Sequence, residues 1–325
     1  MTHEFALSSS FFSFPVWHAT RYRAESRVVT IQGEVSTNRS VVPVQFSTST
    51  IMSSDLDITK CFEFAKELML HAGKILESSF ESKKEVYDKG ELDFVTDVDY
   101  KIEKIFIDAL SKQFPDHKII AEETIGMEKI PELTDAPTWF LDPIDGTTNL
   151  IHSFPHVCIS LGLTVCKELV LGIIYNPLCS ELYSAIKGEG AFLNEKPIHT
   201  SKITELKKAL LFCDSSILKI MKKNKDIHAA RFDALIEMTQ TTRNTGSGAL
   251  ALAYIARGAV DCFHYDGLRP WDVAAGTLII REAGGTIIDT KGGAYDIMNP
   301  HTIAAANEIL AREMSKVITD TDLKT

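Results

Sequence analysis

The carboxylates best placed for chemistry lie in residues 139–149, which read Trp-Phe-Leu-Asp-Pro-Ile-Asp-Gly-Thr-Thr-Asn. Asp142 and Asp145 are three residues apart, and Pro143 between them stiffens the turn. Two carboxylates held this close repel each other unless positive charge lies between them, and a divalent cation with oxygen ligands supplies that charge. The amides of residues 146–148 could open a helix and bind an anion. A metal beside an anion site predicts phosphate chemistry.

Two further carboxylates could join this pair. An expected strand over residues 117–121 ends at Glu122, and another over residues 138–141 ends at Asp142. Strand ends are a common location for active sites in layered α/β folds. Asp272 falls in the first turn of an expected helix. Taken singly, Glu122 is explained as a solvated loop residue and Asp272 as an acid that complements the helix dipole.

An acidic segment over residues 93–99 precedes another expected helix. It reads Asp-Phe-Val-Thr-Asp-Val-Asp, and either Thr96 or Asp97 would cap that helix. Helix capping alone accounts for the segment when it is considered in isolation.

The glycines Gly246 and Gly248 offer a competing interpretation. With Ser247 and the residues that follow, they match the dinucleotide-binding pattern G-x-G-x-x-A, and Asp266 lies where a ribose-binding acid belongs. That pattern requires a buried strand before it, but residues 239–244 are polar. We therefore expect these glycines to allow close backbone approach to a ligand, or packing at a helix start, rather than to bind a nicotinamide cofactor.

Hydrophobic periodicity places the elements that must position these residues. Apolar residues at spacings of three and four predict helices, and apolar runs broken by turn residues predict an antiparallel meander over residues 157–193. Beyond residue 206, strands alternate with helices. The expected helices cover residues 58–76, 102–110, 226–240, 247–257, 271–283 and the C-terminal segment. The expected strands cover residues 117–121, 138–141, 209–213, 260–265, 285–289 and 302–306.

The length of 325 residues allows a large core and two subdomains. We expect residues 54–196 to form an N-terminal α+β subdomain with most of the candidate acids. Residues 197–325 would form a C-terminal α/β subdomain, with the polar stretch 196–206 as the boundary. Residues 1–53, rich in Ser and Thr, are expected to be a disordered extension, and Met52 could be an alternative start.

The composition argues against several classes of protein. The net charge of −10 and the pI of about 5.5 oppose nonspecific nucleic-acid binding, which needs a basic face. No apolar run approaches the ~20 residues that span a bilayer, so no membrane partner is expected. The six cysteines form no C-x-x-C pair and mostly lie in apolar runs, which predicts buried thiols and a cytoplasmic location. Because an acidic chain repels a phosphorylated substrate, bound cations would have to reverse the charge locally.

Together these motifs resemble the inositol monophosphatase family over about residues 55–320. Asp-Pro-Ile-Asp-Gly-Thr-Thr-Asn at residues 142–149 matches the family's first signature, and Pro-Trp-Asp-Val-Ala-Ala-Gly at residues 270–276 matches its second. The glutamate pair at residues 122–123 lies upstream at the family's distance, and residues 93–99 resemble its D-x-V-T-x-x-D segment. The resemblance is specific because four ordered motifs agree.

The resemblance implies an α/β (α+β) fold, a layered α-β-α-β-α sandwich, usually a homodimer, which hydrolyses a small phosphate monoester with Mg²⁺ and is inhibited by lithium. The implied ligands for two or three Mg²⁺ ions are Glu122, Asp142, the backbone carbonyl of Ile144, Asp145 and Asp272. The implied catalytic residues, which activate or position the attacking water, are Asp99, Glu122, Asp142 and Thr147. The implied substrate contacts are Asp145, Gly146, Thr147, Gly246, Ser247, Gly248 and Asp272.

One position departs from the family's pattern. Animal inositol phosphatases of the family place a ring-binding glutamate seven residues before the second-signature aspartate, where this chain has Tyr265. Asp266 is adjacent, so either residue could contact the substrate. Gly248 also replaces a more usual alanine. These changes leave the implied metal ligands intact and bear on the identity of the substrate.

The sequence therefore predicts Mg²⁺-dependent hydrolysis of myo-inositol monophosphate to inositol and phosphate by metal-activated water. One alternative is a related phosphatase that acts on another small ester, such as a sugar phosphate or a nucleotide 3′-phosphate. Another is a catalytically silent member of the fold. The complete set of acids argues against a silent member, because an unused acidic cluster costs stability.

Overall fold

The computed structural model describes residues 56–82, 85–90 and 93–325. Contacts divide the chain into two units, Met1–Cys61 and Phe62–Thr325, and the fold below is that of the second unit. Helix α1 (Ile58–Ser79) begins in the first unit and continues into the second. The expected disordered extension over residues 1–53 and the alternative start at Met52 lie outside the described residues.

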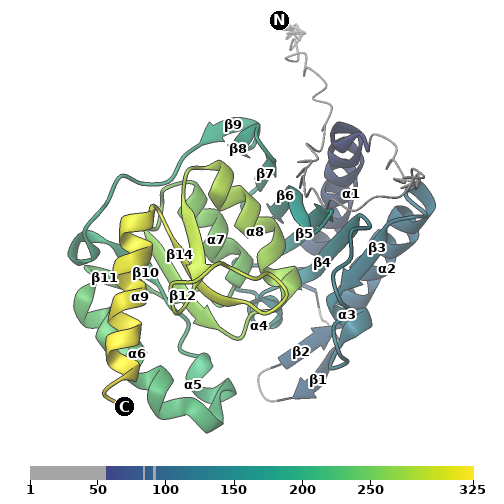
Figure 1. Ribbon diagram of the computed structural model, residues 1–325. Coiled ribbons are helices and arrows are strands. Elements are labelled where there is room, and N and C mark those ends of the chain that lie inside the picture. Colours follow the sequence, from purple (N-terminus) through teal and green to yellow (C-terminus); the bar gives the residue numbers. More distant parts are fainter. Residues whose placement is uncertain (1–55, 83–84, 91–92) are drawn as a thin grey trace, which may run out of the picture. The chain divides into compact units, whose positions relative to one another are not determined.

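The described strands of the second unit form two large sheets and one hairpin (Figure 1). The larger sheet has the order β3-β4-β5-β6-β7-β8-β9, in which β3 and β4 are parallel and the other neighbours are antiparallel. Its strands are β3 (Lys118–Ala121), β4 (Thr138–Asp145), β5 (Cys158–Val165), β6 (Glu168–Asn176), β7 (Glu181–Ile186), β8 (Gly190–Leu193) and β9 (Lys196–Ile198).

The second sheet has the order β11-β10-β12-β14-β13. Strand β10 is parallel to both of its neighbours, while β14 is antiparallel to both β12 and β13. Its strands are β10 (Leu210–Phe212), β11 (Thr241–Arg243), β12 (Cys262–Asp266), β13 (Thr286–Asp289) and β14 (His301–Ala305). The separate antiparallel hairpin joins β1 (Val86–Gly90) to β2 (Asp93–Thr96).

Helices alternate with these sheets in layers (Figure 1). Helices α7 (Gly248–Ala256) and α8 (Pro270–Glu282) pack against each other between the two large sheets. Helices α6 (Lys225–Met238) and α9 (Glu308–Asp322) cover the outer face of the second sheet. Helix α2 (Asp97–Gln113) packs on β4 from the other side of the larger sheet. The expected α-β-α-β-α sandwich is confirmed.

Small residues bring α8 close to the larger sheet. A Cβ atom at Gly162 would lie 2.8 Å from the Cβ of Ala274, and one at Gly172 would lie 2.6 Å from the carbonyl oxygen of Ala275. Glycine is therefore required on both strands for the helix to sit this low. Close packing fixes the N-terminal end of α8, and with it Asp272, over the strands that carry the other acids.

The structure refines the expected elements at several points. The meander over residues 157–193 is confirmed, and β9 extends the same sheet by one strand. Asp142 and Asp145 do not lie on a turn beyond the strand, because β4 continues to Asp145 with an irregularity between the two residues. Of the described helices, none is long and apolar enough to cross a membrane.

Candidate active site

Three carboxylates from separate elements meet at one edge of the larger sheet. Oxygen atoms of Glu122, Asp142 and Asp272 all lie within 4.8 Å of one another. Glu122 begins the short helix α3 (Glu122–Ile125), Asp142 lies near the end of β4, and Asp272 is in the first turn of α8. Asp142 is only 2% exposed, so its charge is removed from water.

Backbone pairing explains why these acids converge. Strands β3 and β4 are parallel with Ala121 opposite Leu141, so the residues that follow, Glu122 and Asp142, emerge at the same edge. Asp272 is held from the helix side, where its Oδ2 accepts a hydrogen bond of 2.7 Å from the backbone N–H of Arg269. The strand ends and helix start expected from the sequence therefore meet in space.

The electrostatics of the cluster call for a cation. Burial, followed by the charges of Glu122, Asp145 and Asp272, raises the pKa of Asp142 well above its usual value. Burial and the nearby charge of Asp145 raise the pKa of Asp272 to about 7. Several acids that destabilise one another's charged forms, all with oxygen donors, fit a hard divalent cation such as Mg²⁺.

Asp145 connects this cluster to the start of α7. Its Oδ2 accepts hydrogen bonds from the hydroxyl of Ser247 and the backbone N–H of Ala249, each at 2.6 Å. Its Oδ1 accepts a longer bond of 3.3 Å from the N–H of Gly248. The loop that the resemblance assigns to the substrate is thereby held directly against the acidic site.

Asp99 and Thr147 lie together, although 48 residues separate them. The Thr147 hydroxyl is 3.4 Å from Asp99 Oδ1 and 3.1 Å from the carbonyl oxygen of Ile144. The other oxygen of Asp99 accepts bonds from the amide and hydroxyl of Thr96, which caps α2. The capping role expected for residues 93–99 is thus present, and it also fixes Asp99 beside the site.

The backbone after Asp145 is shaped by Gly146. Its φ of +96° lies in the left-handed region, and a Cβ there would lie 2.7 Å from the carbonyl oxygen of His156. Only glycine fits this turn into α4 (Thr147–Ile151).

Asn149 was not singled out from the sequence, although it ends the first signature. Its Nδ2 donates to the carbonyl oxygens of His156 at 2.8 Å and Thr245 at 2.6 Å. A third, longer contact of 3.4 Å reaches the carbonyl oxygen of Gly246. Asn149 therefore joins the turn after β4 to the loop that precedes α7.

An open pocket of about 960 Å³ adjoins the acids. The expected site residues that line it are Glu122, Asp142, Ile144, Asp145, Gly146, Thr147, Gly246, Ser247, Gly248, Tyr265 and Asp272. Its far wall includes Asp214 and Ser216, which follow β10 and carry no recognisable motif in the sequence. Strand β10, which they follow, pairs with β12, and Tyr265 near the end of β12 lines the same pocket.

Tyr265 and Asp266, both left open by the sequence, face opposite ways. Side chains alternate along β12, so Tyr265 lines the pocket while Asp266 points to the layer of α6 and α9. The Asp266 side chain is 9% exposed, and its oxygens bind Arg231 at 2.5 Å and the Thr290 hydroxyl at 2.8 Å. Asp266 is therefore a structural acid on the far face of the strand, which also removes the ribose-binding role of the competing interpretation.

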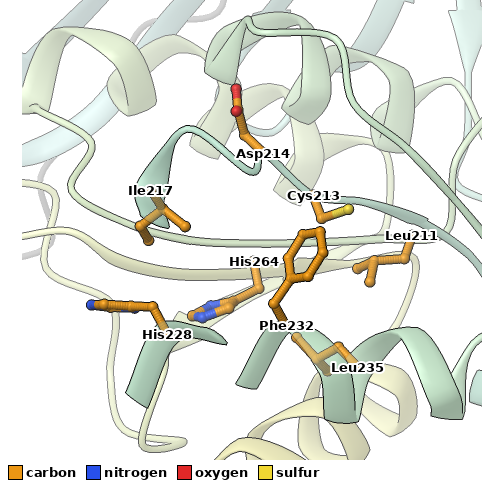
Figure 2. Close-up of a pocket in the computed structure, with 8 residues that line it drawn as sticks. All are labelled: Leu211, Cys213, Asp214, Ile217, His228, Phe232, Leu235 and His264. Carbon is orange, nitrogen blue, oxygen red and sulfur yellow. The ribbon is translucent and has the colours of Figure 1, made fainter. Parts of the chain in front are cut away.

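A second, small cavity lies on the face of β12 opposite to the open pocket. It has a volume of about 20 Å³ and is lined by His264, from the same face of β12 as Asp266, and by His228 from α6. Figure 2 shows both imidazoles beside this cavity, with the carboxylate of Asp214 directed away from them.

Comparison with known proteins agrees with this geometry. The model of the inositol monophosphatase family matches residues 57–321. The chain is 40% identical to an inositol monophosphatase of Mesembryanthemum crystallinum over 260 residues, which cover 80% of this chain and 96% of the relative. It is 40% identical to inositol monophosphatase 2 of Rattus norvegicus over 268 residues, 80% of this chain and 88% of that protein. The crystal structure of the extragenic suppressor protein suhB from Bartonella henselae has a TM-score of 0.73 at 31% identity, covering 80% of this chain and 98% of that one.

Proposed function

The chain belongs to the inositol monophosphatase family, and we infer that it is a phosphoric monoester hydrolase that acts on inositol monophosphate. The observation that carries this inference is the meeting of Glu122, Asp142 and Asp272 at the mouth of a pocket large enough for a small ester. Binding of a metal ion explains why three acids that repel one another are gathered at the end of a strand.

We propose that Mg²⁺ binds to the carboxylates of Glu122, Asp142, Asp145 and Asp272 and to the carbonyl oxygen of Ile144. Asp142 would be the central ligand of this set, because the charges of Glu122, Asp145 and Asp272 all act on its carboxylate. When bound, two or three such ions lower the pKa of water and stabilise charge on the leaving oxygen. Lithium inhibition and a homodimeric assembly are part of the same proposal.

Thr147 and Asp99 would orient the attacking water. The Thr147 hydroxyl faces the pocket and also contacts Asp99 Oδ1, so it can accept a proton from water while passing its own to that carboxylate. Asp99 is fixed for this role by its bonds to Thr96, which leave Oδ1 directed at Thr147. Glu122 would assist from the opposite side of the cluster.

The phosphate would be bound by backbone amides. Gly146 and Thr147 follow Asp145 directly and line the same pocket, where the left-handed turn at Gly146 exposes the chain. Backbone amides next to the acidic cluster would hold the phosphorus atom close to those acids. Ser247 and Gly248 would contact the alcohol part of the ester from the α7 side.

We propose that the protein is located in the cytoplasm, which is a reducing compartment. All six cysteines are free thiols, and Cys61, Cys158, Cys213 and Cys262 are buried. Unpaired cysteines are the normal state in that compartment.

Phosphate release from a panel of monoesters tests the substrate. The panel includes inositol monophosphate, a sugar phosphate and a nucleotide 3′-phosphate, each with and without Mg²⁺. Faster release from inositol monophosphate than from the other two supports the proposal. Release only from the other esters would instead identify a related phosphatase, and no release from any ester would identify a silent member of the fold.

A further inference from the structure

A buried glutamate on α2 has no part in the chemistry proposed so far. Glu103 is only 4% exposed and lies in the buried stripe of α2, between Asp99 and Phe106. Residues four apart share one face of a helix, so Asp99 and Glu103 project from the same side of α2. A buried carboxylate is unfavourable unless hydrogen bonds or a cation compensate its charge, so its contacts indicate what it does.

Glu103 caps the short helix α3, which carries Glu122. Its Oε2 accepts a hydrogen bond of 2.7 Å from the backbone N–H of Glu123, and its Oε1 accepts one of 2.6 Å from the Thr124 hydroxyl. The residue before α3, Ala121, makes no side-chain hydrogen bond that caps the helix. The cap is therefore supplied by α2, which lies against α3 (Figure 1).

The peptide group between Glu122 and Glu123 is held at both of its polar atoms. Its N–H donates to Glu103, and its carbonyl oxygen, that of Glu122, accepts a bond of 2.7 Å from the backbone N–H of Gly126. On the other side of Glu122, Ala121 is paired with β4 in the larger sheet. Because a peptide group is planar, these contacts fix the backbone of Glu122 and the direction in which its side chain projects.

We propose that Glu103 is a positioning residue for metal binding, which fixes the carboxylate of Glu122 within reach of the other acids of the cluster. The inference rests on the proposed function, because Glu122 is one of the proposed Mg²⁺ ligands. One face of α2 would then support the site at two places, through the contact of Asp99 with Thr147 and through the cap that Glu103 gives to α3.

Binding of Mg²⁺ tests this role without relying on turnover. The full-length chain is titrated with Mg²⁺ in a calorimeter, and the Mg²⁺ concentration for half-maximal phosphate release from inositol monophosphate is measured alongside. Glu103→Ala should raise both the Mg²⁺ Kd and the half-maximal concentration by about 10- to 100-fold, the usual effect of removing a group that orients a metal ligand.

Glu103→Gln separates the position of the group from its charge. The carboxamide oxygen can accept from the N–H of Glu123, and the carboxamide NH₂ can donate to the Thr124 hydroxyl oxygen. Because both hydrogen bonds are kept, the Mg²⁺ Kd should stay within about threefold of that of the unaltered protein.

Thr124→Val provides the same test if Glu103→Ala does not fold. It removes one of the two hydrogen bonds from the side of α3 and leaves the bond to the backbone N–H of Glu123. The Mg²⁺ Kd should rise by a smaller factor than in Glu103→Ala, about three- to tenfold.

Asp261→Ala is the matched control for a loss of stability. Asp261 is also buried, at 8% exposure, and its oxygens likewise accept from one backbone N–H, that of Leu210 at 2.7 Å, and one hydroxyl, that of Ser201. It lies just before β12 in the second sheet and joins that strand to β10. The variant should lose stability in urea unfolding but leave the Mg²⁺ Kd unchanged.

Three results would overturn the inference. They are a folded Glu103→Ala variant with an unchanged Mg²⁺ Kd, an equally weakened Glu103→Gln variant, or the same weakening in Asp261→Ala. If the unaltered protein binds Mg²⁺ and releases phosphate but Glu103→Ala binds Mg²⁺ as tightly, only the positioning role fails. If the unaltered protein neither binds Mg²⁺ nor releases phosphate, the proposed function fails and the positioning role fails with it.

Discussion

Asp142 is the most deeply buried carboxylate of the acidic cluster that we propose as the metal site. Its burial, followed by the charges of three neighbouring acids, raises its pKa, and its Oδ1 accepts a bond of 2.9 Å from the backbone N–H of Ile144. A charge placed there costs stability unless a cation compensates it. Without a cation, the charge of this residue would therefore lower the stability of the fold, whereas its position suits metal binding.

Asp142→Asn should therefore separate stability from activity. We expect phosphate release to fall by at least about 100-fold, since a carboxylate that we propose as a metal ligand is lost. The melting temperature in chelator should stay the same or rise, because one repelling charge is removed from the cluster. Both are measured on the same preparation, by phosphate release and thermal denaturation.

Asp108→Asn provides the control for that variant. Asp108 is exposed on α2 and forms an ion pair of 3.0 Å with Lys104 one turn away. It should alter neither activity nor melting temperature. A fully active Asp142→Asn enzyme would show that the cluster does not hold the metal.

A substitution at Gly146 tests whether activity requires the left-handed backbone conformation of the turn after β4. Gly146→Ala should lose about 1–2 kcal/mol to left-handed strain, and more from the contact with the His156 carbonyl. Activity should fall with it, because the neighbouring amides move.

Gly188→Ala is a matched comparison for Gly146→Ala. Gly188 has a φ of +82°, but a Cβ there would meet nothing within 4 Å. The variant should lose only the stability that left-handed strain costs, measured by denaturant unfolding. It should keep full activity. Equal losses of stability in the two variants would contradict the steric account of Gly146.

At the scale of elements, sequence patterns located the acids but not all of their surroundings. Apolar runs end at Ala121 and Leu141, and parallel pairing then brings the next residues together. Asp214 and Ser216 could not be found this way, because their place beside the pocket depends on the pairing of β10 with β12, which no local period encodes. The sequence also does not show which side chains of β12 face the pocket, because Phe263 and His264 are both compatible with a buried face of the strand.

The second sheet is joined to its outer helices by a partly buried ion-pair network. Arg231 on α6 bonds Asp266 on β12 and also bonds both oxygens of Asp322 on α9, at 2.7 Å each. Burial alone would raise the pKa of Asp266, but His264, the Thr290 hydroxyl and Arg231 together lower it below its usual 3.8. The network links the strand that carries Tyr265 to the C-terminal helix.

Asp266→Asn should therefore lose stability in a pH-dependent way. A lowered pKa in the folded state means that the carboxylate stabilises the fold above its unfolded pKa and loses this effect as the pH falls through the folded pKa. The deficit of the variant in urea unfolding should be on the order of 3 kcal/mol above about pH 5, and should shrink at lower pH.

Asp320→Asn is the control for this prediction. Asp320 pairs with Lys316 on the exposed side of the same α9, and its loss should cost under about 0.5 kcal/mol. A deficit of Asp266→Asn that stays constant down to pH 3 would mean that the charge of Asp266 contributes nothing.

At the scale of the whole molecule, an acidic chain has to bind an anionic ester. The net charge is −10, and the pocket for the ester lies against further carboxylates. Binding of a phosphate monoester at that place is favourable only if cations enter with it or before it. The proposed metal dependence is therefore expected from the charge distribution as well as from the chemistry.

The most direct test of the account is phosphate release from inositol monophosphate by the full-length chain as Mg²⁺ is varied. The account predicts negligible release in excess EDTA, recovery on adding Mg²⁺, and no recovery in Asp142→Asn. Release that continues unchanged in EDTA, or that survives in Asp142→Asn, would contradict the assignment of Glu122, Asp142 and Asp272 as the metal site.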